Sequence, residues 1–237
     1  MILHRNMLIE IENNRIIKTE LNFFGKNRKE GSDMVNRNLY LLICDEEVYI
    51  KKFNLPKAKG ELLYNLVKNE LCFSVGNTNN ILFDYKVTNH LNECIEVIVF
   101  YINSQKIAFL RENNCYKNIK KIILVQFAIK KYYKKSINVD NYIMLFIYDK
   151  GLYILAINEN NLVANSIIES FSGDEEKLLL NLEIFKNKFS DQLINVKNIY
   201  LVDISINPKH EKNNVFNSMV VKTLDKYKKE KLLGSFK

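Results

Sequence analysis

The sequence predicts an α/β fold made of two related halves, each a mostly mixed sheet with helices packed on it. Runs in which apolar and polar residues alternate predict strands, and apolar residues spaced three or four apart predict helices. These elements occur twice in a similar order: a hairpin or meander, then helix, strand and helix. With 237 residues, 47% of them apolar, the chain is long enough for one large domain or two modest ones.

The first half begins with four predicted strands, which we expect to pair as two hairpins. The turns fall at Asn13-Asn14 and Asp45-Glu46. Leu55-Pro56 ends this region, because proline cannot continue a strand ladder. The four strands are Met7–Ile11, Arg15–Leu21, Asn38–Ile43 and Glu47–Phe53.

A helix is predicted next, because residues 57–71 place apolar side chains on one stripe: Leu62, Leu63, Leu66, Val67 and Leu71. Strands follow at Ile81–Val87 and Cys94–Tyr101. Asn103 or Ser104 can cap a helix that runs to about Asn113. The first half closes with a strand at Ile119–Leu124 and a helix at Gln126–Lys135.

The second half opens with a predicted meander of three strands, at Asn141–Tyr148, Leu152–Asn158 and Leu162–Glu169. Ser172-Gly173-Asp174 begins a long helix whose apolar positions are Leu178, Leu182, Phe185 and Phe189. After a strand at Asn198–Ile204, we expect a final amphipathic helix with one apolar side, formed by Phe216, Met219, Val220, Thr223, Leu224 and Tyr227.

Composition excludes several classes of protein. Seven glycines and two prolines are too few for long linkers or collagen-like segments. The longest apolar run has about seven residues, whereas a membrane helix needs ~18. The N-terminal stretch MILHRNMLIEIENN lacks the apolar core of a signal peptide. The four cysteines form no C-x-x-C pair, and we expect buried thiols in a reducing cytoplasm at Cys44, Cys72, Cys94 and Cys115.

The formal net charge of +8 is unevenly distributed. Seven lysines and no acid occur between Lys117 and Lys135, and six lysines lie in the last sixteen residues. Such an excess can indicate nucleic acid, an anionic membrane surface or an acidic partner. The lysines alternate with apolar residues, and no RNP-type aromatic motif or zinc-finger spacing is present. A solvated basic face is therefore favoured over a nucleic-acid site.

No local motif for covalent catalysis is present: the sequence has no G-x-S-x-G, no Walker A loop, no G-x-G-x-x-G and no H-E-x-x-H. His4, His90 and His210 lie far apart, so no metal site is expected. Asp149-Lys150-Gly151 is either a tight turn or the remnant of a phosphate-binding loop. As a turn, it would place Gly151 at the positive-φ position.

The stretch from about Tyr49 to Ile157 carries a resemblance to a known family. Its markers are Leu55-Pro56 at a strand end, the next helix with Glu61 and Glu70, the strand Phe83-Asp84-Tyr85-Lys86-Val87, the strand Ile95–Phe100, and Phe127-Ala128. In order and spacing, these markers resemble the cytoplasmic actin-like proteins of bacterial type IV pilus machines, PilM, and the cytoplasmic domain of the type II secretion protein GspL.

The resemblance implies an actin-like fold of duplicated, ribonuclease H-like halves with an inserted α/β subdomain. The first lobe would comprise residues 1–56 and 118–137, the inserted subdomain residues 57–117, and the second lobe residues 138–237. A GspL-like protein would continue past residue 237 into an apolar span of ~20 residues, flanked by lysines such as those near this end.

In nucleotide-binding members of this family, two Asp-x-Gly turns and a late Gly-Gly turn hold the nucleotide. The corresponding stretches here are Glu10-Ile11-Glu12-Asn13-Asn14, Asp149-Lys150-Gly151 and Val202-Asp203-Ile204-Ser205. Glycine survives only at Gly151, and a Cβ where backbone must approach phosphate is a steric block. We therefore expect Glu10, Glu12, Asp149, Gly151 and Asp203 to be inactive remnants, with no ATP, Mg²⁺ or other metal bound and no enzymatic activity.

By resemblance, the protein would be a cytoplasmic scaffold at the inner face of the cell membrane. It would bind the N-terminal tail of a PilN-like bitopic protein and link it to the assembly ATPase. Tyr49, Asp84 and Tyr85 are the residues we expect to line the groove for this tail. Two alternatives stay open: an active actin-like ATPase or kinase, and a basic nucleic-acid-binding protein.

Overall fold

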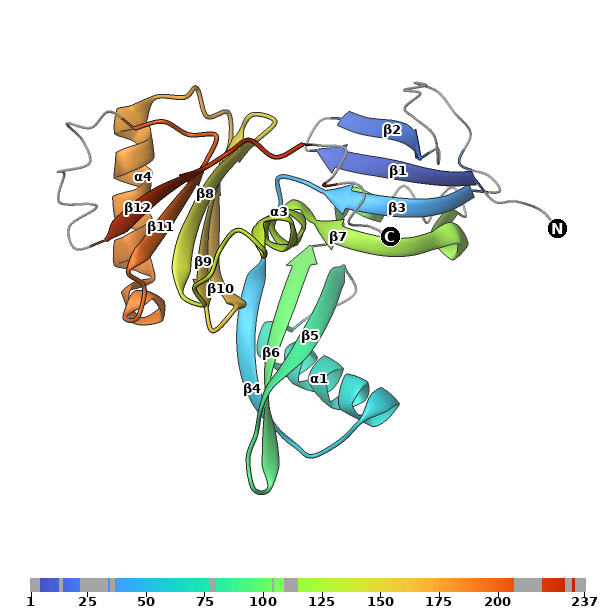
Figure 1. The fold of residues 1–237 in the computed structure, drawn as a ribbon. Coiled ribbons are helices and arrows are strands. Elements are labelled where there is room, and N and C mark those ends of the chain that lie inside the picture. The colour runs from blue at the N-terminus through green and yellow to red at the C-terminus, as the bar shows by residue number, and fades with distance from the viewer. Residues whose placement is uncertain are drawn as a thin grey trace. The chain divides into compact units, whose positions relative to one another are not determined.

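A computed structural model gives the fold (Figure 1). It describes residues 5–12, 15–21, 34, 37–76, 80–103, 105–108, 115–206, 219–228 and 232. The chain forms two compact units. The main unit comprises Met1–Asp45 and Asn113–Lys237, and the inserted unit comprises Glu46–Glu112.

The first sheet of the main unit has the strand order β2-β1-β3-β7. Its strands are β1 (Arg5–Glu12), β2 (Arg15–Leu21), β3 (Arg37–Ile43) and β7 (Ile119–Leu124). β1 and β2 form the predicted antiparallel hairpin, with Glu12 opposite Arg15. β3 runs parallel to both β1 and β7.

The second predicted hairpin is wrong, because the strand after β3 belongs to a different sheet. Leu41, Leu42 and Ile43 are all buried, although their side chains point alternately to the two faces of β3. A strand buried on both faces is typical of a parallel sheet covered on both sides. Alternation alone predicted the strand but could not identify its partners.

The second sheet of the main unit has the order β10-β9-β8-β11-β12. The predicted meander is confirmed as three antiparallel strands, β8 (Tyr142–Tyr148), β9 (Gly151–Asn158) and β10 (Asn161–Ile168). β11 (Asn198–Val202) runs parallel to β8. The predicted long helix is α4 (Glu175–Lys188), which begins at the N-cap Asp174 and buries Leu182 and Phe185 in the core of this sheet.

The expected final amphipathic helix is wrong. Val220–Leu224 is instead strand β12, which pairs in parallel with β11 at the edge of the sheet. The β-branched Val220, Val221 and Thr223 favour a strand over a helix. Met219 packs against the core of this sheet, and Phe216 lies outside the described residues.

In chain order, α3 (Val125–Tyr133) follows β7 of the first sheet and precedes β8 of the second, and it agrees with the predicted helix. A short 3-10 turn, Cys115–Asn118, precedes β7. The helix expected after Asn103 begins as a 3-10 turn at Gln105–Ile107, with the Asn103 Oδ1 accepting the Gln105 N–H at 3.0 Å. Its remainder, at residues 109–114, lies outside the described residues.

The inserted unit is a three-stranded antiparallel sheet of order β4-β6-β5 with one helix packed on it. Its elements are β4 (Tyr49–Pro56), α1 (Gly60–Val75), β5 (Ile81–His90) and β6 (Cys94–Asn103). Leu63, Val67 and Leu71 of α1 are buried against the sheet, whereas Leu62, predicted on the same stripe, is 63% exposed. β4 pairs with β6 and lies in this unit, whereas residues 49–56 were expected in the first lobe.

Among the helices that the structure describes, none combines the length and the apolar character that a membrane-spanning segment requires.

We predict that Leu182→Ala will lower the free energy of unfolding by about 2–5 kcal/mol, because it leaves a cavity at a fully buried position of α4. Leu180→Ala removes the same atoms from a side chain that is 56% exposed on the same helix, and should cost no more than ~0.5 kcal/mol. Urea denaturation followed by circular dichroism measures both. Equal effects of the two variants would contradict the packing of α4.

Candidate functional site

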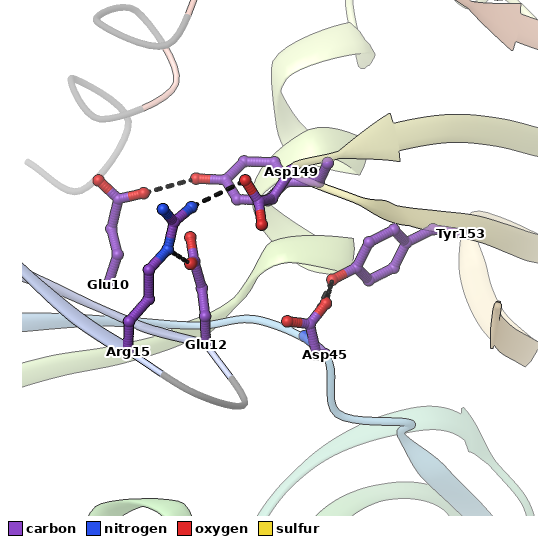
Figure 2. A network of polar contacts seen from close by, with 7 residues as sticks. Glu10, Glu12, Arg15, Asp45, Asp149 and Tyr153 are labelled. Atoms are coloured by element: carbon purple, nitrogen blue, oxygen red, sulfur yellow. Dashed lines mark hydrogen bonds and ion pairs between the residues drawn. The ribbon is translucent and has the colours of Figure 1, made fainter. Parts of the chain in front are cut away.

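The candidate site lies in the main unit, where the carboxyl ends of β1 and β3 meet the turn between β8 and β9 (Figure 2). Open α/β sheets bind ligands at the carboxyl ends of their strands, because the connecting loops there leave a crevice. A pocket of about 250 Å³ occupies this position. It is lined by Glu12, Arg15, Asp45, Asp149, Lys150, Gly151, Glu169 and Ser170.

Arg15 connects the two sheets. It stands opposite Glu12 in the β1–β2 ladder, and its Nε donates to the Glu12 carboxylate. Its Nη2 donates to Asp149 Oδ1 at 2.8 Å, in the β8–β9 turn. The hydrogen bond and charge of Glu12, followed by the charge of Asp149, raise the pKa of Arg15 above its ordinary value. One guanidinium therefore neutralises a carboxylate from each sheet.

Acidic side chains outnumber basic ones in the lining of the pocket. Four carboxylates line it, from Glu12, Asp45, Asp149 and Glu169, against the two cationic side chains of Arg15 and Lys150. Arg15 already bridges two of these carboxylates, those of Glu12 and Asp149. A polyphosphate entering here would meet net negative charge.

Glu10 is not among the lining residues of the pocket, and it contacts the second sheet through a tyrosine. The Tyr148 hydroxyl donates to Glu10 Oε2 at 2.9 Å, and both residues are buried. Burial raises the pKa of Tyr148 well above its ordinary value, and the neighbouring Cys44 and Glu10 add to the effect. The ring of Tyr148 stacks on that of Tyr227, whose hydroxyl donates to the Ile147 carbonyl at 3.2 Å.

Asp45 makes a second connection between the sheets. It follows β3 with φ 52°, and its Oδ1 accepts the Tyr153 hydroxyl at 3.0 Å. The Asp45 N–H donates to the same hydroxyl oxygen at 2.9 Å. Tyr153 is fully buried, stacks on Phe146 with ring centroids 4.8 Å apart, and has a pKa raised chiefly by burial.

Gly151 is needed for close approach to its neighbours. The expectation that it takes the positive φ of the turn is wrong, because Asp149 does so with φ 51°. A Cβ on Gly151 would lie 3.1 Å from Tyr153 Cε2 and 3.3 Å from Asp45 Oδ1. Both distances are shorter than ordinary van der Waals contact, so the absence of a side chain lets Asp45 and Tyr153 meet above the turn.

The remnant residues predicted from the sequence are partly brought together. Glu12, Asp149 and Gly151 line the pocket, and Glu10 accepts a hydrogen bond from Tyr148, the residue before Asp149. Asp203 follows β11 with φ 53° and is not among the lining residues. Its carboxylate pairs with Lys226 at 2.8 Å, and its N–H donates to the Leu224 carbonyl at 3.1 Å.

Arg15, Asp45 and Tyr153 were not predicted from the sequence to be site residues. Arg15 could have been found, since a tight hairpin through Asn13-Asn14 places it opposite Glu12 as a cross-strand ion pair. Asp45 was interpreted as a turn residue, and its contact with Tyr153, 108 positions away, has no local signal. In the part of the chain that the structure describes, no group of side chains could hold a metal ion.

The three expected groove residues lie in the inserted unit but do not share one face. Tyr49 on β4 stacks on Tyr101 of β6, with ring centroids 5.3 Å apart, and is 52% exposed. Tyr85 on β5 packs against the core beneath α1. Asp84 precedes it and therefore points to the opposite face of the sheet.

We predict that Gly151→Ala will destabilise the protein by about 1–3 kcal/mol, because the new Cβ overpacks against Tyr153 and Asp45. Urea denaturation measures the change. Lys150→Ala, at the exposed neighbouring position of the turn, is the matched control and should stay within ~0.5 kcal/mol of the parent. A neutral Gly151→Ala would contradict the close approach.

We predict that stability falls as the pH rises above about 10, the pKa of tyrosine in an unfolded chain. Burial raises the pKa of Tyr148, Tyr153 and Tyr227, so above that pH the unfolded chain loses protons that the folded chain keeps. Tyr148→Phe should therefore lose less stability than the parent between pH 8 and pH 11, measured by urea denaturation. An equal loss in both proteins would contradict this.

Comparisons with known proteins give the fold. No protein-family model matches the sequence, and neither does any curated protein. A protein of unknown function with an actin-like ATPase fold, from Bacteroides thetaiotaomicron VPI-5482, is similar over 99% of both chains, with 13% identity and a TM-score of 0.53. The cytoplasmic domain of EpsL, an inner membrane component of the type II secretion system of Vibrio cholerae, gives a TM-score of 0.53 and 8% identity.

The EpsL similarity covers 98% of this chain and 94% of that domain. The PilM-PilN type IV pilus biogenesis complex is similar at a TM-score of 0.48 and 9% identity, over 98% of this chain and 90% of that one. The two similarities with a TM-score of 0.53 confirm the expected fold class: the chain has the actin-like ATPase fold.

Proposed function

We propose that this chain is a cytoplasmic scaffold with an actin-like fold that does not bind or hydrolyse ATP. It would serve an inner-membrane platform of the type IV pilus or type II secretion kind. The observation that carries the proposal is the position of Arg15, whose guanidinium links Glu12 and Asp149 where two nucleotide loops are expected. Because this guanidinium already pairs with two carboxylates, it would not neutralise the phosphates of a nucleotide.

The carboxylates of the first loop support the proposal that the chain does not bind ATP. Glu10 and Glu12 stand where the family has an Asp-x-Gly turn, and both are buried. Glu10 accepts a hydrogen bond from Tyr148, and Glu12 pairs with Arg15. To bind a phosphate here, the protein would have to break one of these contacts and leave a buried carboxylate without its partner, which is costly.

The other two loops are also engaged by the protein's own side chains. Asp149 pairs with Arg15, and Gly151 is covered by Tyr153 and Asp45. Asp203, in the third loop, pairs with Lys226. The next residue in the chain, Tyr227, stacks its ring on that of Tyr148. Each loop that would hold a nucleotide in an active relative therefore serves to hold the main unit together.

The scaffold role rests on the fold and on the resemblance of the sequence. The cytoplasmic domain of EpsL, which shares this fold over nearly its whole length, is part of an inner-membrane assembly. The markers around Leu55-Pro56 and Phe83–Val87 resemble PilM. We therefore propose a PilN-like bitopic membrane protein and the assembly ATPase as partners, and a position peripheral to the inner face of the cell membrane.

We propose that the tail of the bitopic partner binds the inserted unit beside Tyr49. This ring is half exposed and stacks on Tyr101, which in turn faces Phe83 of β5 in the ladder. Phe83 stacks on Tyr64 of α1, at 5.2 Å between ring centroids. Aromatic surface of this kind suits an apolar peptide side chain. Tyr85 and Asp84 border this row on the two faces of β5.

We predict no saturable ATP binding below ~1 mM with Mg²⁺ present, because the pocket is net acidic and Arg15 is engaged. Isothermal titration calorimetry with the full chain measures this. Binding in the micromolar range, or phosphate release above that of a buffer control, would support the alternative of an active ATPase and overturn the proposal.

We predict that the chain captures a synthetic peptide from the cytoplasmic start of its bitopic partner, measured by fluorescence anisotropy. Tyr49→Ala should weaken binding roughly tenfold or more if this ring anchors the peptide. Tyr40→Ala, a change of the same residue type on β3 of the main unit, is the matched control and should bind as the parent does. Failure to bind any such tail, or the assembly ATPase, would overturn the scaffold role.

A further inference from the structure

The two sheets of the main unit are joined at one end by side chains that belong to different hairpins. Arg15 of the β1–β2 hairpin reaches Asp149 in the β8–β9 turn. Beside it, Tyr148 reaches Glu10, and Tyr153 reaches Asp45 (Figure 2). The first of these contacts is ionic, and the other two are hydrogen bonds from buried tyrosines.

The ionic contact differs from the others in how it responds to charge. Glu12 is only 5% exposed at its side chain, Asp149 is 34% exposed, and Arg15 is 55% exposed. Without the guanidinium, Glu12 would be a nearly buried carboxylate facing Asp149, Asp45 and Glu169 across the pocket. Like charges in such a site repel, and water cannot fully solvate the buried one.

The shape of the guanidinium suits this position. It presents five N–H donors in a rigid plane, so Nε and Nη2 can point to two carboxylates at once. In this chain these two donors serve carboxylates on different sheets. A lysine at position 15 would supply a compact point charge without this fixed fork. Arginine at this position is therefore suited to hold two separate hairpins at a fixed spacing.

We infer that Glu12, Arg15 and Asp149 form a latch that holds the two sheets of the main unit together without any ligand. Arg15 is the internal cation of this latch, because it pairs with one carboxylate from each sheet. The inference concerns the free protein, so it stands apart from the identity of any partner.

The latch has a consequence for how the protein responds to its surroundings. Because Arg15 is more than half exposed, salt screens its attraction to Asp149, while the buried Tyr148–Glu10 contact is screened much less. Closure of the main unit should therefore loosen at high ionic strength. It should also depend on the charge of Asp149.

Hydrogen–deuterium exchange of the full chain without ligand tests the latch, read at the amides from Tyr148 to Tyr153. Arg15→Ala and Asp149→Ala should each speed exchange there by roughly two- to tenfold at low salt. The double variant should exchange no faster than the faster single variant, because both changes remove the same Arg15–Asp149 contact. For the parent, 1 M salt should produce a similar increase.

Two further variants keep the test decisive. Asp149→Asn keeps the shape of the turn and the Glu12–Arg15 pair, so it reports on the latch even if Arg15→Ala folds poorly. Lys18→Ala removes a positive charge from the same strand, opposite Ile9, and should leave exchange of the β8–β9 turn unchanged. The latch is overturned if Asp149→Asn exchanges like the parent, or if the two alanine variants have additive effects.

Discussion

A single guanidinium between two carboxylates is the interaction on which the main unit depends. Glu12 and Asp149 come from hairpins more than a hundred residues apart, and both carboxylates face the same pocket. Arg15 converts their mutual repulsion into attraction across the junction of two sheets. The same contact that joins the sheets therefore also engages a guanidinium that lines the pocket.

A layer of buried tyrosines lies beneath this ion pair. Tyr148 on β8 and Tyr153 on β9 belong to the hairpin that carries Asp149. Their hydroxyls reach Glu10 on β1 and Asp45 after β3. Tyr227 stacks on Tyr148 from the segment after β12. Each ring contributes apolar surface to the core, and each hydroxyl has a partner, as a buried tyrosine requires. Gly151 leaves room for this layer by carrying no side chain.

Much of the fold could be predicted from the sequence, because period-2 and period-3.6 patterns report burial directly. The meander from Tyr142 to Ile168 and the helix after Asp174 appear as predicted. Strand partners could not be predicted, since alternation does not say which strand lies beside which. β4 was therefore predicted to pair with β3, although it belongs to another sheet. The residues of β12 were predicted to be helical, because their apolar positions also fit the stripe of a helix.

The candidate site was predictable only where its signal is local. Glu12, Asp149 and Gly151 were assigned through the family resemblance of short local stretches, whereas Asp45 and Tyr153 meet through long-range packing. Asp203 was grouped with the others by resemblance, and its pairing with Lys226 depends on β12 lying beside β11. Tertiary contacts of this kind leave no trace in the neighbouring residues.

A crystal structure of the full chain grown with millimolar ATP and Mg²⁺ tests the central claim most directly. The account predicts that the Arg15 guanidinium lies between Glu12 and Asp149, with no nucleotide between the two hairpins. Phosphate density in the pocket, with Arg15 displaced from Asp149, would contradict it.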